Sequence, residues 1–340
     1  MWSVHGLGLI GLVLLGGIMS DHEGETAEPE GARSAFERDD VQAVHGAMGR
    51  FARVVDPLRP ELYRYCLALT GSPWEAEDLT QESIARAFVR LGQLHSDLED
   101  PKRYLFRVAT NAWIDEVRRH RPELLDPLPE PSDEASRPTT PEIEEALLSL
   151  AGSLPPRERV CVLLADVFGF PHAEIAGLVQ ASPGAVKVAV HRGRKRLATH
   201  PKTTIPSTAV SAEHGRIIDA LVTAFNERDV EALVALMHSD AVSDIVGIYG
   251  GLGEAPARNI IVHTFEDSTL RRAQRVDFRG EPIIVLWYEV DGKEVVRDVW
   301  RATGYDGHCS RVLYYYFCPE TLTAVAKEMG HPVVTQGYRY

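Results

Sequence analysis

Long apolar runs are scarce in this 340-residue chain, and so are cysteine and positive charge. The most apolar stretch, from Leu7 to Met19, has about 13 residues, whereas a helix needs about 20 to span a bilayer. Only His5 precedes it as a basic residue, whereas a secretory signal usually begins with Lys or Arg. We therefore expect no membrane contact, a cytoplasmic location and a translation start at Met19.

Cysteine is limited to Cys66, Cys161, Cys309 and Cys318, which lie far apart and include no CxxC pair. Structural zinc sites and the disulfide frameworks of small secreted domains both use closely spaced cysteines. The sequence therefore predicts reduced thiols, no metal site and no cofactor.

Basic residues are outnumbered by acidic ones, 36 to 49, and the formal net charge is −13. The surplus is local, because residues 21–40 and residues 121–145 each hold eight acidic and two basic residues, a net charge of −6. Both segments have a composition that disfavours a packed core. The rest of the chain is close to neutral, so a basic face on one module is compatible with the total.

Two proline-rich polar stretches, residues 121–142 and 199–211, divide the chain, since repeated prolines remove the amide donors of a helix. The expected organisation runs from an acidic N-terminal segment to a C-terminal α+β domain, with these boundaries: segment 1–40, helical module 41–120, linker 121–141, second helical module 142–198, linker 199–210, α+β domain 211–340. The predicted fold class is multidomain, with two all-α modules followed by an α+β domain.

In both helical modules apolar residues recur at three- and four-residue spacing, as in PWEAEDLTQESIARAFVRL and DPKRYLFRVATNAWIDEVRRHRP. The last block has two helix-like segments, 213–227 and 230–237, and then runs rich in β-branched and aromatic residues. Asp-Gly pairs at 291–292 and 306–307 separate these runs and predict hairpin turns. The final FCPETLTAVAKEMGHPVVTQGYRY predicts a helix and a closing strand.

The stretch AVKVAVHRGRKRL, residues 185–197, holds five Lys or Arg residues and no acidic one. Upstream, residues 172–179 read as a short helix, and Ser182 with Pro183 predicts the start of a second. Two helices at this spacing are typical of a helix-turn-helix, whose second helix lies in the DNA major groove. The charges alone also fit a solvated cationic helix end. The capped turn favours DNA binding.

Two blocks of the sequence resemble bacterial sigma factors of the extracytoplasmic-function (ECF) group, in the sigma-70 family. The block that resembles region 4 is LPPRERVCVLLADVFGFPHAEIAGLVQASPGAVKVAVHRGRKRL. The block that resembles region 2 is YRYCLALTGSPWEAEDLTQESIARAFVRL together with the DPKRYLFRV block. The resemblance implies a transcription factor without catalytic residues, which binds core RNA polymerase, recognises −10 and −35 promoter elements and directs transcription initiation. The alternative is a helix-turn-helix regulator with a ligand-sensing C-terminal domain, acting without polymerase.

The resemblance assigns residues to three surfaces. Polymerase binding falls on a polar helix stripe that we expect to be exposed: Glu77, Asp78, Gln81, Glu82 and Arg86. Contact with the −10 element falls on the next helix: Arg103, Tyr104, Arg107, Asn111, Asp115, Arg118 and Arg119. Contact with the −35 element falls on the helix-turn-helix: Ser182, Gly184, Lys187, His191, Arg192, Arg194, Lys195 and Arg196. Such side chains can bind phosphates or base edges, and Tyr can stack on an unpaired base.

One pair departs from the family pattern. Many relatives have polar or basic residues directly after the Lys, where this chain has Val188 and Ala189. We expect fewer groups that read bases, whereas phosphate contacts should persist.

The segment HGRIIDALVTAFNERDVEALVALMHSDAVSDIVGIYG, which follows the second linker, resembles the start of SnoaL-like domains, cone-shaped α+β folds whose helices cover a curved sheet around a pocket. Minimal ECF factors lack such a domain, and the resemblance implies a regulatory role in place of a separate anti-sigma protein. The pocket candidates are Tyr249, His263, Trp287, Trp300 and Tyr314, with Asp244 and Tyr288 as further members. Three readings stay open: a protein-contacting surface, a pocket for a small-molecule ligand, and catalysis by a His–Asp pair.

Overall fold

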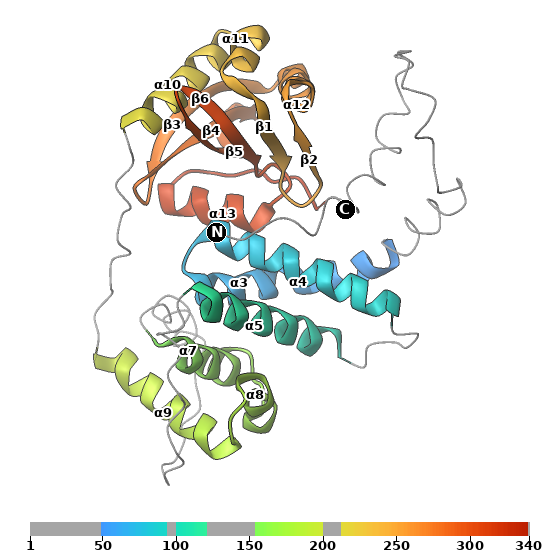
Figure 1. The fold of residues 1–340 in the computed structure, drawn as a ribbon, viewed down its shortest axis with the longest axis vertical. Helices are drawn as coiled ribbons and strands as arrows, with labels where there is room; N and C mark the ends of the chain where they lie inside the picture. The colour runs from blue at the N-terminus through green and yellow to red at the C-terminus, as the bar shows by residue number, and fades with distance from the viewer. Residues whose placement is uncertain (1–48, 94–99, 121–153, 200–211, 339–340) are drawn as a thin grey trace. The chain divides into compact units, whose positions relative to one another are not determined.

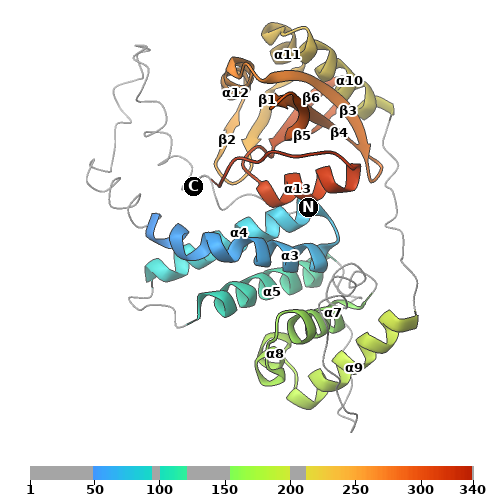
Figure 2. The same ribbon diagram turned by 180° about the vertical axis from the view of Figure 1, so that it is seen from behind.

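The computed structural model describes residues 49–93, 100–120, 154–199 and 212–338 (Figure 1; Figure 2 shows it from behind). These residues form two compact units, one made of the described residues up to 199 and the other of those from 212 onward. In the first unit we distinguish a first helical module (49–120) and a second helical module (154–199); the second unit is the C-terminal domain (212–338). The expected N-terminal segment, the first linker and all but Thr199 of the second lie outside the described residues.

The first helical module begins with helical residues 49–55 and continues with the 3₁₀ turn η1 (Asp56–Leu58) and the helices α3 (Arg59–Thr70), α4 (Pro73–Gln93) and α5 (Pro101–His120). α3 ends at Gly71, whose φ of 77° lies in the left-handed region that favours glycine. Pro73 begins α4 two residues later, where a missing amide costs little. The apolar faces of α3, α4 and α5 meet in a core that includes Leu62, Leu69, Leu79, Leu105 and Phe106.

The second helical module has four elements: α7 (Pro156–Val162), the π-helical η4 (Leu163–Val167), α8 (His172–Val179) and α9 (Pro183–Thr199). The backbone amide of Ala185 donates to Ser182 Oγ at 3.1 Å, which confirms the predicted capped start of α9. Ile175 of α8 and Val190 of α9 are buried across the turn. The helix-turn-helix expected from the sequence is therefore present.

Aromatic rings join the two helical modules. Phe106 of α5 lies 4.8 Å, centroid to centroid, from Phe168, which follows η4. Phe168 also meets Tyr65 of α3 edge-on at 5.3 Å. Because all three rings are at most 8% exposed, the modules share an apolar interface within one compact unit.

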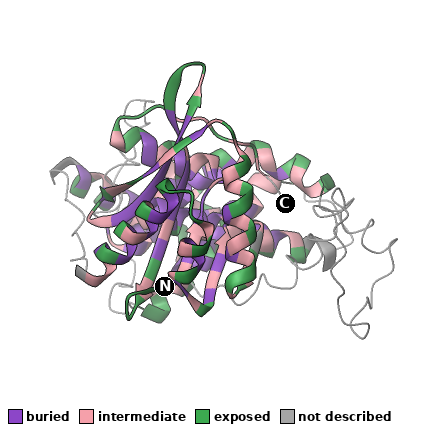
Figure 3. Ribbon diagram, turned by 90° about the horizontal axis from the view of Figure 1, so that it is seen from above, coloured by how far each residue is buried: buried purple, intermediate pink, exposed green. Residues whose placement is uncertain are grey.

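The C-terminal domain is built on a six-stranded sheet of order β2-β1-β6-β5-β4-β3. Its strands are β1 (Met237–Ile245), β2 (Tyr249–Leu252), β3 (Leu270–Phe278), β4 (Glu281–Val290), β5 (Lys293–Tyr305) and β6 (His308–Tyr314). β1 and β6 pair in parallel, whereas the other neighbours are antiparallel. Figure 3 shows the long central strands as mostly buried.

Tight turns set the register of the three hairpins between β3 and β6. The predicted turns at Asp291–Gly292 and Asp306–Gly307 are confirmed, with φ of 50° and 73° in the first and 51° and 76° in the second. Two consecutive positive φ values are the mark of a type I′ turn. Arg279–Gly280 makes the same turn between β3 and β4, with φ of 51° and 81°. The sequence did not reveal this third turn, because Arg is not a preferred residue there.

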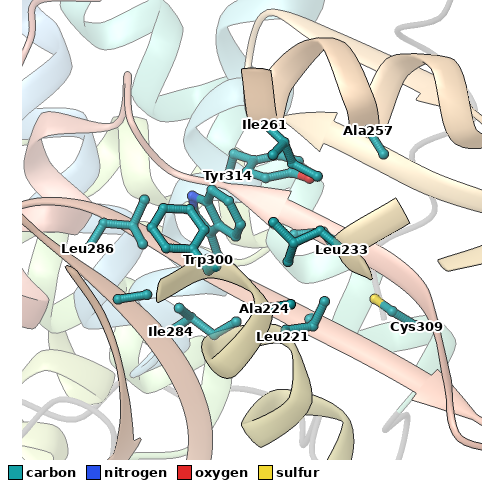
Figure 4. Close-up of a cluster of buried hydrophobic side chains, with 14 of the residues drawn as sticks. Leu221, Ala224, Leu233, Ala257, Ile261, Ile284, Leu286, Trp300, Cys309 and Tyr314 are labelled. Carbon is teal, nitrogen blue, oxygen red and sulfur yellow. The ribbon is translucent and has the colours of Figure 1, made fainter. Parts of the chain in front are cut away.

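Helices cover the sheet on both faces (Figures 1 and 2). One face bears α10 (Ala212–Asn226), α11 (Val230–Ala235) and α12 (Glu254–Glu266), and the other bears α13 (Pro319–Met329). Figure 4 shows Trp300, Leu286 and Ile284 of the sheet with Leu221 and Leu233 of the helices in one buried cluster. The expected arrangement of helices over a curved sheet is confirmed, and apolar side chains pack between the sheet and α10, α11 and α12.

Two expected elements differ in extent. The predicted helix 230–237 ends at Ala235, and Met237 already belongs to β1. The predicted closing strand is reduced to one bridge between Val333 and Val296, although the preceding helix α13 is confirmed. Pro332 explains the reduction, since proline has no amide to donate to a ladder.

A pair of glycines tests the packing of the second helical module. A Cβ on Gly193 of α9 would lie 2.4 Å from Val162 Cγ2, whereas a Cβ on Gly177 of α8 meets nothing within 4 Å. Val162 is fully buried and β-branched, so it has little freedom to move. We predict that Gly193→Ala lowers the free energy of unfolding by about 1–3 kcal/mol, whereas Gly177→Ala raises it by up to about 1 kcal/mol. Urea unfolding of the full chain measures both, and equal effects would contradict the close approach.

Candidate nucleic-acid interface

The basic helix α9 presents two different faces. Val186, Val188, Ala189 and Val190 are buried in the second helical module. The outer face comprises Ser182, Pro183, Arg192, Lys195 and Arg196, which are exposed, with Gly184, Lys187, His191 and Arg194 partly exposed beside them. The two residues that depart from the family pattern therefore lie in the module core. Val188 and Ala189 therefore do not occupy exposed positions from which a side chain could read bases.

Two of the predicted −35 residues form ion pairs with carboxylates of the same module. Arg194 donates from Nε and Nη2 to both oxygens of Asp166 in η4, at 2.7 and 2.5 Å. The Asp166 side chain is only 2% exposed, and its hydrogen bonds raise the pKa of Arg194. Arg196 lies 3.4 Å from the Glu158 carboxylate. Arg194 thus orients α9 on η4, a role that the sequence did not reveal because Asp166 lies 28 residues away.

The predicted −10 residues share one face of α5. Arg103, Arg107, Asn111 and Asp115 follow at four-residue spacing, which places them in line on a helix. Arg107, Asn111, Asp115, Arg118 and Arg119 are exposed, whereas Arg103 and Tyr104 are partly exposed. The structure therefore brings this group together as a single stripe along the helix.

Carboxylates partner the arginines of this stripe. Near the end of α5, Arg118 contacts Asp115 at 2.6 Å and Arg119 contacts Glu116 at 3.0 Å. Near its start, Arg103 forms an ion pair with Glu174 of α8, in the other module. The stripe is basic at its two ends, and carboxylates of α5 and α8 hold its guanidinium groups in place.

The predicted polymerase-binding stripe on α4 is only partly as expected. Asp78, Gln81 and Glu82 are partly exposed and Arg86 is exposed, with Arg86 Nη2 at 2.5 Å from Glu82. Glu77, by contrast, is fully buried and forms an ion pair with buried Arg59 of α3. The expectation of an exposed Glu77 is wrong, because Arg59, 18 residues earlier, neutralises it inside the helix pair.

The predicted pocket residues of the C-terminal domain do not share one pocket. Trp300 and Tyr314 pack at 4.8 Å in the core of Figure 4. Trp287 points to the opposite face of the sheet, since it alternates with core residues of β4, and lines a pocket of about 380 Å³ with His331. His263 is 89% exposed and pairs with Glu266. Tyr249 begins the edge strand β2.

A different acidic residue is placed in the core of this domain. Asp298 of β5 is 4% exposed and accepts hydrogen bonds from Trp300 Nε1 at 2.6 Å and from the Val299 amide at 2.8 Å. Burial raises the pKa of Asp298 to about 7, although these hydrogen bonds favour its charged form. Asp244, the predicted partner of His263, instead pairs with Arg311 at 3.4 Å, and burial raises its pKa. The structure does not bring a His–Asp pair together at these positions.

Within the described ranges, no helix is both long and apolar enough to cross a membrane. The same residues contain no group of three or more His, Cys, Asp or Glu side chains that could hold a metal ion.

Comparison with known proteins gives the two helical modules their family. Residues 54–123 match Sigma-70 region 2, and residues 144–197 match Sigma-70, region 4. The ECF RNA polymerase sigma factor SigE of Mycolicibacterium smegmatis is 31% identical over 201 residues, which cover 57% of this chain and 76% of SigE. The chain belongs to the ECF family of RNA polymerase sigma factors.

Two further relatives are sigma factors of Mycobacterium tuberculosis. SigG of Mycobacterium tuberculosis is 29% identical over 250 residues, 63% of this chain and 66% of SigG, so the alignment spans just under two thirds of that relative. The crystal structure of Mycobacterium tuberculosis SigJ covers 80% of this chain and 98% of its own, with 21% identity and a TM-score of 0.31. The second helical module, which matches Sigma-70, region 4, is the one that has the helix-turn-helix arrangement.

Asp298 makes the stability of the C-terminal domain depend on pH. Its folded-state pKa of about 7 lies above the value of about 3.9 expected for an unfolded chain, so the folded form holds more protons in between. We predict that this carboxyl lowers the free energy of unfolding by up to about 1.4 kcal/mol per pH unit as pH rises from about 4 to about 7, with no further loss above. Urea unfolding across this range, compared with Asp298→Asn, isolates the contribution; parallel curves for the two proteins would contradict it.

Proposed function

We propose that this ECF sigma factor binds core RNA polymerase through α4, contacts the −10 element with α5 and the −35 element with α9, and so directs promoter-specific initiation. The observation that carries the proposal is the pairing of a capped helix-turn-helix with a second helix that presents arginines and Asn111 in one stripe. Side chains of these kinds can contact DNA phosphates and base edges.

The −35 contact rests on the outer face of α9. Lys187 and Arg192 lie one helical turn and a half apart there, and the Ser182 cap fixes the start of the helix. At about 1.5 Å per residue, α9 is roughly 25 Å long, enough to cross the major groove and reach the flanking phosphates. Arg194 contributes indirectly, because its bond to Asp166 fixes which face of α9 is turned outward.

The polymerase contact rests on Asp78, Gln81, Glu82 and Arg86. These side chains occupy the outer side of α4, and the buried Arg59–Glu77 pair beneath them anchors α4 to α3. The alternative of a regulator that acts without polymerase is not favoured, because the first helical module belongs to Sigma-70 region 2.

For the C-terminal domain we propose regulation of the sigma factor rather than catalysis. The sheet face under α10, α11 and α12 is packed with core side chains, and the predicted His–Asp pair is separated, as described above. The pocket at Trp287 and His331, on the other face of the sheet, is the site that we propose for a small-molecule ligand. A cytoplasmic location follows from action on RNA polymerase.

Charge reversal on α4 tests the polymerase contact. We predict that Glu82→Lys weakens binding to core RNA polymerase by about tenfold or more, since like charges at an interface are strongly unfavourable. Asp240→Lys, the same change at an exposed position of β1, is the matched control and should leave binding unchanged. Co-elution with core polymerase and run-off transcription measure the effects. Failure of the unaltered chain to co-elute would refute the proposed function.

The salt dependence of promoter binding tests the α9 contact. Each phosphate contact contributes about 0.9 to the slope of log affinity against log salt concentration. We predict that Arg192→Ala reduces this slope for the reconstituted holoenzyme by about that amount. Arg216→Ala removes another exposed arginine, from α10, and serves as the control. An unchanged slope for Arg192→Ala would remove that residue from the interface.

A further inference from the structure

Two arginines of the −10 stripe are already bound by an acidic residue of the other module. Glu174, in the first turn of α8, accepts a hydrogen bond from Arg103 Nη1, and its second oxygen lies 3.8 Å from Arg107 Nη2. The Glu174 side chain is 17% exposed, so part of its hydration has been replaced by these guanidinium groups. Guanidinium groups bind carboxylates and phosphates in the same way, so Glu174 competes with a DNA phosphate for these two arginines. Asp100, 3.0 Å from Arg103 Nε, is a further partner of Arg103 in its own module.

Aromatic packing surrounds this ionic contact. The Arg103 guanidinium lies over the Phe170 ring, 5.5 Å from its centroid, and Phe170 lies 5.7 Å from Phe106. Phe106 in turn meets Phe168, and all three rings are at most 8% exposed. The ion pair therefore lies at the rim of an apolar contact that excludes water and strengthens it.

A second anchor lies at the other end of the interface. Arg159 of α7 donates from Nη1 to the Leu69 carbonyl of α3 and places its guanidinium 5.4 Å from the centroid of the Trp113 ring. Burial lowers the pKa of Arg159 to about 10, which leaves it charged at neutral pH. The contact between the modules thus involves α3, α5, α7 and α8 rather than one exposed ion pair.

This packed arrangement cannot serve both promoter elements at once. Elements at −10 and −35 are about 25 base pairs apart, or roughly 85 Å at 3.4 Å per base pair. The rings of Phe106 and Phe168 are 4.8 Å apart, and α9 begins only 15 residues after Phe168. Two helices of roughly 25–30 Å that belong to touching modules do not span that distance. The modules must separate before both elements are bound.

We propose that Glu174 acts as an intramolecular substitute for a DNA phosphate, which holds the two helical modules closed and masks Arg103 and Arg107 in the chain without polymerase. The proposal rests on the proposed function, because it takes these arginines as −10 contacts. In the closed form the affinity of α5 for DNA is reduced by the small fraction of open molecules. A partner that binds the open form better, such as core polymerase, releases the arginines by shifting that equilibrium.

Opening can be followed without DNA. The four native cysteines are buried, so spin labels can be placed on Val89→Cys of α4 and Gly177→Cys of α8, both at exposed positions. We expect one short distance between the labels in the full-length chain. Glu174→Gln keeps the side-chain shape but removes the charge, and should shift the closed-to-open ratio about ten- to hundredfold toward open, giving longer and broader distances.

DNA binding then reports on the masking. The same Glu174→Gln substitution, without labels, should tighten binding of a short single-stranded DNA of mixed sequence by about tenfold or more, because phosphates no longer compete with the carboxylate. Glu61→Gln is the matched control: it removes an acidic residue that pairs with Lys102 at 2.6 Å inside the first module and causes the same change in net charge. It should alter neither the label distances nor the affinity.

The outcomes separate this inference from the proposed function. Unchanged label distances in Glu174→Gln would show that Glu174 does not hold the modules closed and would overturn the proposal, even if the chain still directs transcription with core polymerase. Longer distances without tighter DNA binding would support closure by Glu174 and contradict the assignment of Arg103 and Arg107 to DNA. Equal gains in DNA affinity for Glu61→Gln and Glu174→Gln would show that the change in net charge explains the gain. That result would overturn the proposal that Glu174 masks Arg103 and Arg107.

Discussion

Pairing between guanidinium groups and carboxylates is the interaction on which the helical unit depends. Arg59 and Glu77 lock α3 to α4, Arg194 and Asp166 lock α9 to η4, and Arg103 and Glu174 join the two modules. Each pair is at least partly withdrawn from water, where removal of one partner leaves an expensive uncompensated charge. An acidic chain can therefore present a basic DNA-binding face only with those arginines that its own carboxylates leave accessible or can release.

This constraint divides the basic helix into two kinds of residue. Arg192 is exposed on the outer face of α9, whereas Arg194 is held by two hydrogen bonds to a carboxylate that is almost fully buried. The first can exchange water for phosphate at little cost. The second determines the orientation in which the first is offered. Charge counting along the sequence treats the two as equivalent, but only the three-dimensional structure separates them.

Features governed by neighbouring residues were predictable from the sequence. The Ser182 cap, the α8 boundaries and the Asp-Gly turns all follow from local backbone chemistry, and each is confirmed. The family resemblance likewise rests on contiguous motifs. The exposure of Glu77 was predicted wrongly because it depends on Arg59, in another helix, and a helical pattern alone cannot show such a partner.

The candidate pocket was only partly predictable for a related reason. Aromatic residues in alternating strands were identified correctly as sheet residues, but the bulge between Leu286 and Trp287 in the β4–β5 pairing and the face of each strand decide which of them meet. Trp300 and Tyr314 lie on the face covered by α10, α11 and α12, whereas Trp287 lies on the other face. No local pattern in β5 indicated that Asp298 would be buried with the indole of Trp300 as its partner.

The missing side chain at Gly193 has a consequence for how the protein can move. α9 approaches Val162 so closely that even a methyl group would collide, and Arg194, the next residue, is fastened to Asp166. The helix therefore has neither the clearance to roll about its own axis nor the slack to slide. It can move only together with the whole second helical module. Adaptation to DNA therefore has to occur by rigid-body displacement of that module or by deformation of the duplex itself.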